Sequence, residues 1–241
     1  MQVIMIIYPD NWQEIGVPIK QIQIEAILLQ ILSDIKCKSL SFSGGIDSSL
    51  ILYYMAGLYD HVEAYTIASS EEHPDVKYSK MMAQQFNNVV HRIYIPTKAE
   101  IEAEKQTDDD FPGDLAVRLY YKFIANYINE IIACDTIDEF MCGYYAHQEN
   151  PSEAIYYKYI RELQELHLIP LNKNSGKVKV YLPYADQRLI YLLSQIPLSE
   201  KVDKDRRKKI MQILVQDKVP QEIIMRHKYG FCDALKIKRR S

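Results

Sequence analysis

The sequence has few cysteines and no long hydrophobic run, and both absences exclude classes of protein. The four cysteines show no Cys-x-x-Cys spacing, so we expect neither a structural zinc site nor a disulfide framework. Reduced thiols then favour a cytoplasmic setting. No apolar run approaches the roughly 20 residues that span a bilayer, and residues 1–8 lack the basic region and the cleavage site of a signal peptide. No membrane partner is expected.

A large surplus of charge of one sign is also absent. The 29 basic and 32 acidic residues give a net charge of −3, which argues against a protein built mainly to coat nucleic acid. There is no internal repeat, and no linker rich in glycine, proline or serine divides the chain. We expect a single domain over residues 1–241.

Strand and helix patterns alternate through the first part of the chain. The expected helices are 22–35, 47–58, 76–86, 98–105 and 114–129, and the expected strands are 39–42, 62–68, 89–95 and 130–134. This alternation predicts right-handed βαβ units and a parallel, Rossmann-like α/β sheet with helices on both faces. The α/β core should cover residues 20–140. A mostly helical part should follow over 141–235, with helices at 153–166, 186–195 and 206–216 and a turn at 172–177.

One loop between a predicted strand and a predicted helix has the features of an anion site. It reads Ser43-Gly44-Gly45-Ile46-Asp47-Ser48-Ser49. Backbone N–H groups and the helix N-terminus converge at the carboxyl end of a parallel strand, and glycines let the main chain approach a phosphate closely. The loop is not a Walker A motif, because the chain has no G-x-x-x-x-G-K-[ST] pattern.

Asp47 is the unusual residue of this loop, because a carboxylate repels phosphate. It suits the site if Mg²⁺ lies between them, since hard cations take oxygen ligands from both sides. The alternative is that Asp47 only caps the helix and the glycines only make a turn.

A second acidic block, residues 135–144, follows the fourth predicted strand. Asp138 and Glu139 should lie at the carboxyl end of that strand, near Asp47, where a second acid would complete the coordination of Mg²⁺. The alternative is that these acids only match the dipole of a helix N-terminus.

Taken together, these segments resemble a known family. Ser-Gly-Gly-x-Asp-Ser after a first strand is similar to the PP-loop of the ATP pyrophosphatases, which cleave ATP between the α- and β-phosphates. Residues 135–144 resemble the asparagine synthetase signature G-E-G-x-D-E-L-F-x-G-Y, with Cys134 and Thr136 in place of its two glycines. Residues 182–186 resemble the family's L-P-F-x-D element, and residues 219–231 resemble its closing motif L-P-x-x-I-x-x-R-x-K-x-G-F. The resemblance covers about residues 20–233 and is to the synthetase domain of asparagine and β-lactam synthetases.

The resemblance implies a fold, a reaction and a set of residues. The fold would be that of the adenine nucleotide α-hydrolases. The reaction would be an AMP-forming carbon–nitrogen ligation that adenylates a small carboxylic acid and transfers its acyl group to ammonia or an amine. The loop residues Ser43, Gly44, Gly45, Asp47, Ser48 and Ser49 would bind ATP, and Asp47 with Asp138 would hold Mg²⁺. Lys228 stands where the family's lysine reaches the reacting carbonyl and phosphate, and Asp135 where the family carries a glutamate that handles a proton.

Three questions stay open at this point. The sequence shows no glutaminase domain, so the nitrogen would come as free ammonia, from a separate glutaminase subunit, or as an amine on a substrate. A PP-loop enzyme that adenylates a nucleobase of tRNA is an alternative, although the acidic net charge makes nucleic acid an unlikely partner. A non-catalytic nucleotide-binding protein is another, because the signature glycines are replaced. Residues 71–75, by contrast, are expected to form an exposed acidic loop.

Overall fold

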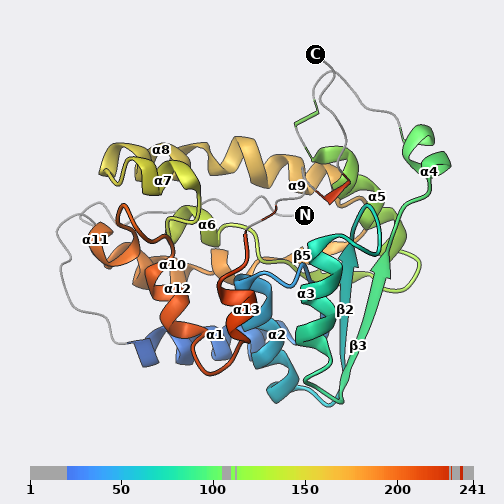
Figure 1. Ribbon diagram of the computed structural model, residues 1–241, viewed down its shortest axis with the longest axis horizontal. Helices are drawn as coiled ribbons and strands as arrows, with labels where there is room; N and C mark the ends of the chain where they lie inside the picture. Colours follow the sequence, from blue (N-terminus) through green and yellow to red (C-terminus); the bar gives the residue numbers. More distant parts are fainter. Residues whose placement is uncertain (1–20, 105–109, 112, 228, 230–233, 236–241) are drawn as a thin grey trace.

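The computed structural model describes residues 21–104, 110–111, 113–227, 229 and 234–235. Its centre is one parallel sheet with the strand order β3-β2-β1-β4-β5 (Figure 1). The strands are β1 (Ser39–Ser41), β2 (Val62–Ile67), β3 (Val89–Tyr94), β4 (Glu130–Ile132) and β5 (Lys179–Tyr181). The predicted α/β class is confirmed. The fifth strand lies beyond residue 140, so the second half of the chain also contributes to the sheet.

Alternation along the strands sends neighbouring side chains into two separate cores. Leu40, Ala64 and Ile132 face a core that includes α1 (Gln21–Ile35) and α2 (Ile46–Leu58). The neighbouring residues Tyr65 and Ile131 face the other core, which includes α5 (Asp114–Ile124). Because the side chains of a strand point to opposite faces in turn, helices cover both faces of the sheet, as the sequence predicts.

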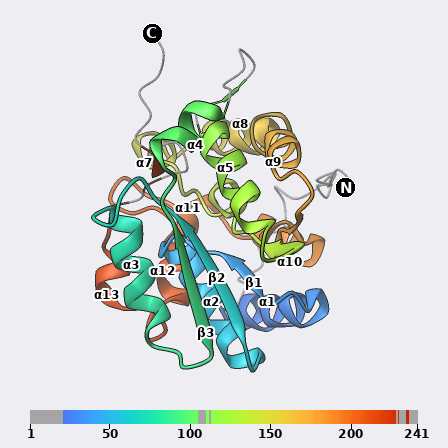
Figure 2. The ribbon, with the colours of Figure 1, turned by 90° about the vertical axis from the view of Figure 1, so that its right-hand side faces the viewer.

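The remaining helices surround these layers (Figures 1 and 2). They are α3 (Pro74–Ala83), α4 (Lys98–Ala103), α6 (Ile137–Phe140), α7 (Tyr145–Glu149), α8 (Glu153–Leu163), α9 (Ile169–Asn174), α10 (Gln187–Ser194), α11 (Leu198–Lys201), α12 (Lys209–Leu214) and α13 (Gln221–Ile224). A π-helical turn (Gln164–Leu168) joins α8 to α9, and a 3₁₀ turn (Pro183–Ala185) precedes α10. Within the described residues, no helix is long and apolar enough to cross a membrane.

Three predicted boundaries are wrong, each for a local reason. Helix α5 ends at Ile124 instead of residue 129, because the side-chain amide of Asn126 donates hydrogen bonds to the backbone carbonyls of Lys122 and Phe123. Residues 172–174 are helical, since the π-helical turn carries the chain past Pro170, which lacks the N–H of a regular helix. The helix predicted from residue 206 begins only at Lys209, because Lys208 has a left-handed backbone (φ 49°).

The strand order fixes where the two acidic loops meet. From β1 the chain builds outward to β2 and β3, and it then crosses back to place β4 on the other side of β1. The connection that follows β1 therefore leads along the sheet to β2 on one side, and the connection that follows β4 leads to β5 on the other side. A crevice opens at such a switch point, outside the carboxyl ends of the strands, and ligands of open α/β sheets bind there.

Lys201, the last residue of α11, is a buried lysine beside Tyr156 of the core that includes α1 and α2. Its side chain is 1% exposed, its Nζ donates to the hydroxyl of Tyr156 at 2.7 Å, and burial lowers its pKa to about 8. In the unfolded chain a lysine keeps a pKa near 10.4. Between these two pKa values the unfolded state binds more protons than the native state, so stability rises with pH in that window.

We predict that Lys201→Met stabilises the protein at pH 7 and that the gain disappears by about pH 10.5. Each pKa unit corresponds to about 1.4 kcal/mol, so the gain at pH 7 should approach about 3 kcal/mol. Denaturant unfolding at pH 7 and pH 10 measures it, with the half-exposed Lys80→Met as the control. A Lys201→Met protein that is less stable than the wild type at pH 7 would contradict the prediction.

Candidate active site

The glycine loop after β1 is shaped by close packing against α3. Gly44 has a left-handed backbone (φ +67°), and a Cβ at this position would lie 2.4 Å from the backbone nitrogen of Ser79. Only glycine is free of both problems, since it has no Cβ and adopts positive φ readily. The hydroxyl of Ser43 accepts from the backbone N–H of Gly45 at 3.3 Å and lies 3.4 Å from the hydroxyl of Ser48.

Helix α2 begins directly after this loop. Gly45 is its N-cap residue and brings no side chain to cap it, while Asp47 stands in its first turn. The uncapped N–H groups and the helix dipole favour an anion at this end. Ser48 and Ser49 are both buried, and the hydroxyl of Ser48 donates to the carbonyl of Gly45 at 3.3 Å. The predicted loop residues are therefore brought together, although Ser49 is fully enclosed in the helix packing.

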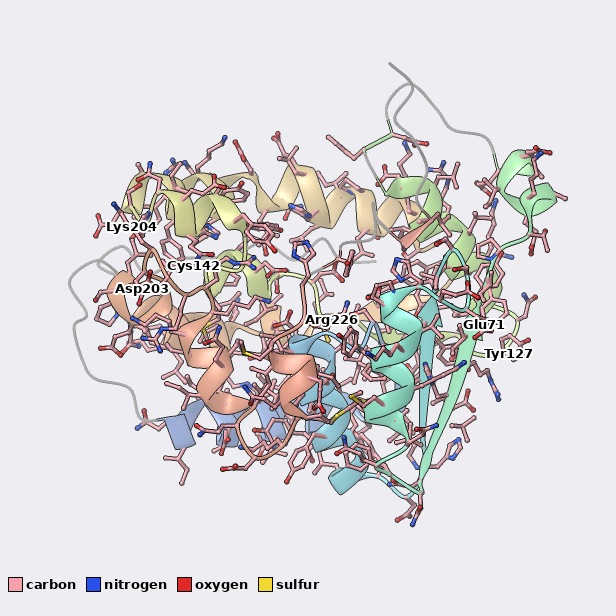
Figure 3. All side chains as sticks on the ribbon, in the orientation of Figure 1. Glu71, Tyr127, Cys142, Asp203, Lys204 and Arg226 are labelled. Carbon is pink, nitrogen blue, oxygen red and sulfur yellow. The ribbon has the colours of Figure 1, made fainter. Side chains whose placement is uncertain are left out.

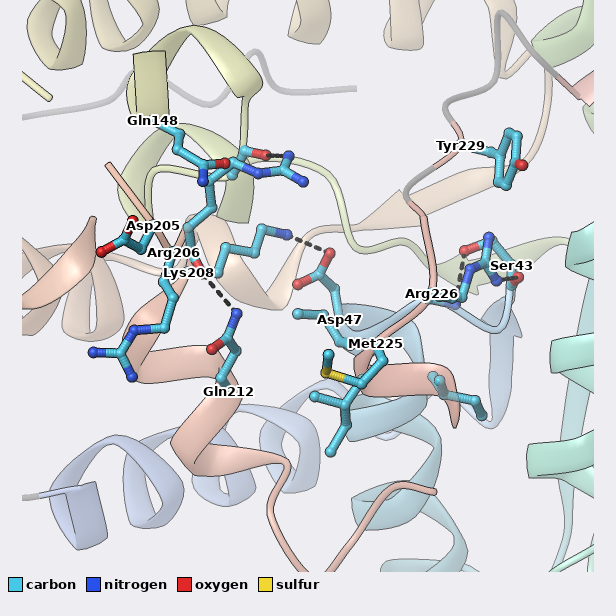
Figure 4. A pocket seen from close by; sticks show the side chains of 16 residues that line it. Ser43, Asp47, Gln148, Asp205, Arg206, Lys208, Gln212, Met225, Arg226 and Tyr229 are labelled. Atoms are coloured by element: carbon cyan, nitrogen blue, oxygen red, sulfur yellow. Dashed lines mark hydrogen bonds and ion pairs between the residues drawn. The ribbon is translucent and has the colours of Figure 1, made fainter. Parts of the chain in front are cut away.

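Lys208 brings the two predicted acidic residues to one point. Its Nζ lies 2.5 Å from Oδ2 of Asp47 and 2.7 Å from Oδ1 of Asp138. Figure 4 shows its side chain reaching across the pocket to Asp47. Gly143 makes room for this contact, because a Cβ there would lie 1.7 Å from Asp138 Oδ1 and 2.4 Å from Lys208 Cε. Position 143 therefore requires glycine, because any side chain there would prevent the contact between Asp138 and Lys208.

Lys208 is held in its charged form by its two partners. Burial lowers the pKa of Lys208, but the carboxylates of Asp138 and Asp47 raise it by more, so its pKa lies above the ordinary lysine value. The sequence does not predict this role for Lys208. It stands in a basic run, residues 206–209, at the start of the helix predicted over residues 206–216. Nothing in the sequence reveals the left-handed backbone of Lys208, which delays the start of that helix.

The loop after β4 has a left-handed backbone at Thr136, a position where the family signature has glycine. Thr136 has φ +81° and is buried, although a β-branched residue is rarely found in that conformation. Its backbone starts the short helix α6, which carries Asp138 in its first turn. The adjacent Glu139 is buried and accepts from the hydroxyl of Tyr144 at 2.6 Å, which ties α6 to the start of α7. Asp135, at the end of the strand, is half-buried beside this loop.

Two segments of the second half of the chain close the site. From residues 182–186, the hydroxyl of Tyr184 donates to the backbone carbonyl of Asp47 at 3.1 Å. From the closing motif, Arg226 donates to the carbonyls of the glycine loop. Lys228 lies outside the described residues, so its predicted role stays a prediction. His227 is exposed, and its Nδ1 lies 2.9 Å from the hydroxyl of Tyr145.

A cavity of about 370 Å³ lies between these segments. Its walls include three of the predicted loop residues (Ser43, Gly45 and Asp47), four basic side chains (Arg206, Arg207, Lys208 and Arg226), and Gly143 and Tyr229. Figure 4 places Lys208 and Asp47 in the middle of this wall, with Arg226 beside Ser43. A cavity with basic walls and a bare helix N-terminus is suited to a polyanion such as a nucleotide triphosphate.

The two carboxylates also suit a hard divalent cation. Oδ1 of Asp47 is buried and has no hydrogen-bond partner among the described residues. No cluster of three or more acidic, histidine or cysteine side chains is found in the described part of the chain. Mg²⁺ is commonly held by one or two carboxylates together with phosphate oxygens and waters, so Asp47 and Asp138 fit such an ion when a nucleotide is also bound.

The comparison with protein families agrees with this geometry. The family model for asparagine synthase matches residues 25–179 and 174–240. The chain belongs to the asparagine synthase family. No curated protein gives a significant match to the sequence. Membership of the asparagine synthase family confirms the resemblance drawn from the motifs and assigns the chain an ATP-using synthetase activity, a ligase in general terms.

The positions of the motifs explain why the family pattern is visible in this chain. Three separate segments meet at this site: Ser43, Asp47 and Gly143 line the cavity, Asp138 pairs with Lys208 on its wall, and Tyr184 donates to the backbone carbonyl of Asp47. Residues 71–75 are only partly the exposed acidic loop that was predicted. Glu71 is exposed and pairs with Lys80, whereas Asp75 is buried.

Proposed function

We propose that this chain is an AMP-forming amide synthetase. It activates a small carboxylic acid with ATP, releases pyrophosphate, and transfers the acyl group to ammonia or another amine. The observation that carries the proposal is the convergence of Asp47 and Asp138, from the loops after β1 and β4, on the buried Lys208 beside the bare N-terminus of α2. Membership of the asparagine synthase family supports it.

The first step forms a bond to the α-phosphate. An oxygen of the substrate carboxylate attacks the α-phosphorus of ATP, the bond to the β-phosphate oxygen breaks, and pyrophosphate leaves with its electron pair. Lys208 and the N–H groups of the first turn of α2 stabilise the negative charge that gathers on the leaving group. Mg²⁺, held by Asp47 and Asp138, would neutralise the phosphate oxygens.

The second step forms the amide. A neutral amine attacks the carbonyl carbon of the acyl-adenylate, a proton leaves the nitrogen, and AMP departs. We assign the proton to Asp135, which lies at the carboxyl end of β4 beside the loop that carries Asp138. We assign stabilisation of the oxyanion to Lys228, because a cation near that oxygen stabilises both the oxyanion and the departing phosphate. The amine donor would be ammonia, which a separate glutaminase subunit would supply, or an amine substrate.

The test is to separate AMP and pyrophosphate from ADP and phosphate after incubation with Mg²⁺-ATP. A panel of carboxylic acids is offered with and without ammonia, beginning with aspartate. We expect AMP formation that depends on one acid, and we expect exchange of labelled pyrophosphate into ATP with that acid even when the amine is left out. Exchange without an amine isolates the first step.

Two results would contradict the proposal. If ATP binds but no acid yields AMP or exchange, adenylation of a nucleobase or a non-catalytic role replaces amide synthesis. If ADP is the product, the bond cleaved is the wrong one for this reaction.

A further inference from the structure

Arg226 is a buried cation that contacts the main chain of the glycine loop. Its Nη1 donates to the carbonyl oxygens of Ser43 at 3.0 Å and Gly44 at 2.9 Å. Its Nη2 is paired with Asp75, and both side chains are nearly fully buried (5% and 6% exposed). The guanidinium also lies over the ring of Tyr78, 4.9 Å from its centre. Figure 3 shows Arg226 near the centre of the molecule, between α13 and α3.

These contacts determine which way the loop's peptide groups point. In a trans peptide the carbonyl and the following N–H point in opposite directions. With the carbonyls of Ser43 and Gly44 turned to the guanidinium, the N–H groups of Gly44 and Gly45 are directed away from it. A loop that binds phosphate needs this arrangement, because N–H groups attract an anion and carbonyl oxygens repel it.

The guanidinium is already engaged by protein groups. Besides the two carbonyls and Asp75, its Nε donates to the backbone carbonyl of His227 at 3.3 Å. A guanidinium has five N–H donors in a fixed fork, so most of its donors serve the protein. Asp75 in turn belongs to the first turn of α3, the helix against which Gly44 packs. One buried ion pair thus joins the loop, α3 and the closing segment.

We propose that Arg226 is a positioning residue for nucleotide binding, and that Asp75 holds it in place. Arg226 acts through the carbonyls of Ser43 and Gly44, keeping the glycine loop in the form that receives the phosphates of ATP. The proposal rests on the proposed function, because it takes ATP to be the ligand of this loop. A cation that only attracted ATP by its charge would need neither the carbonyl contacts nor the buried acid.

If Arg226 and Asp75 acted on the nucleotide through their charges alone, substituting them would change nucleotide binding in opposite directions. Asp75→Asn removes a negative charge beside an anion site, so simple electrostatics would tighten nucleotide binding. If Asp75 instead holds Arg226 on the loop, Asp75→Asn weakens binding, as Arg226→Met does. Arg226→Lys keeps the charge without the planar fork and should fall between Arg226→Met and the wild type.

The experiment measures binding of the α,β-methylene analogue of ATP, which cannot be cleaved between these phosphates, and amide hydrogen exchange over residues 43–49 without nucleotide. We expect about 10- to 100-fold weaker binding in Arg226→Met, weaker binding in Asp75→Asn, and faster exchange of the loop in both. In turnover assays the loss should appear mainly as a higher KM for ATP. Arg188→Met is the control, because Arg188 also forms ion pairs, with Asp34 and Asp186, and, in the part of the chain that the structure describes, makes no contact with this loop.

The outcomes separate this proposal from the proposed function. Wild-type binding with unchanged loop exchange in Arg226→Met overturns the positioning role and leaves amide synthesis standing. Tighter binding in Asp75→Asn also overturns it, in favour of charge alone. A wild-type protein that does not bind the ATP analogue at all overturns both proposals.

Discussion

Asp47→Asn should lose acid-dependent AMP formation by about 10²–10³-fold or more. The substitution keeps the size and shape of the side chain and leaves the backbone carbonyl that accepts from Tyr184 in place. What it removes is a negative charge from the pair that meets Lys208. Without that charge, one of the two carboxylates assigned to Mg²⁺ is gone, and the charge balance around the leaving pyrophosphate is altered.

The matched control for this variant is Asp205→Asn. Asp205 is also an acid on the wall of the cavity, but it is exposed and is not one of the carboxylates that pair with Lys208. It should keep most of the wild-type activity. Rates are measured as labelled pyrophosphate exchange, so that the amine step does not enter. Equal losses in the two variants would mean that negative charge in the cavity matters in general and that Asp47 has no special role.

The dependence of the Asp47→Asn activity on Mg²⁺ concentration tests whether Asp47 is a ligand of the ion. If Asp47 is a ligand of the ion, the residual activity should need a higher Mg²⁺ concentration for half-saturation. If Asp47 only stabilises the N-terminus of α2 as an acid in its first turn, the Mg²⁺ midpoint should stay unchanged and the loss should appear in stability instead.

Much of the fold was predictable because local patterns and packing agree. The apolar spacing of residues 22–35 and the short strand at residue 39 correspond to α1 and β1. Strands β2 and β4 alternate their side chains between two cores, which is the pattern that a sheet covered on both faces requires. The misplaced boundaries all lie where a side chain or a single backbone conformation overrides the pattern, as at Asn126 and Lys208.

The candidate site was predictable only where its functional residues lie close together in the sequence. The glycine loop and the block around Asp138 are such segments, and parallel strands bring their ends together. Lys208 and Arg226 are different, because each reaches the loop from more than 160 residues away in sequence. No periodicity encodes a contact of that kind. The exposed acidic loop predicted at residues 71–75 is wrong at Asp75 for the same reason, since an arginine from the far end of the chain pairs with it in a buried position.

Lys208→Met is the second variant with a large expected effect. Pyrophosphate exchange should fall by about 10²–10³-fold, because a buried cation beside the leaving group is lost. Stability in the absence of Mg²⁺ should fall as well. Removing one partner of a buried ion pair leaves uncompensated charge and costs about 3–5 kcal/mol, and here two carboxylates, Asp47 and Asp138, lose their shared cation.

Mg²⁺ should restore part of that lost stability. An ion that binds the native state and not the unfolded chain raises the melting temperature, and it raises it more the more tightly it binds. In Lys208→Met the ion no longer shares the carboxylates with an ammonium group, so its stabilising effect should exceed that in the wild type. Thermal melts with and without Mg²⁺ measure the difference. Lys209→Met is the control, because the neighbouring Lys209 pairs with Asp203 and not with the site.

The pH dependence of this variant separates an ion pair from ordinary packing. The pKa of Lys208 is raised in the native state, so the stability it contributes is fully present below the ordinary lysine pKa and is lost only as pH rises through the raised value. The difference in stability between the wild type and Lys208→Met should therefore be constant from pH 6 to pH 9. At pH values above about 10.4, the unfolded lysine pKa, that difference should shrink. A difference that persists unchanged into strong alkali would show that the methylene chain of Lys208, and not its charge, holds the two loops together.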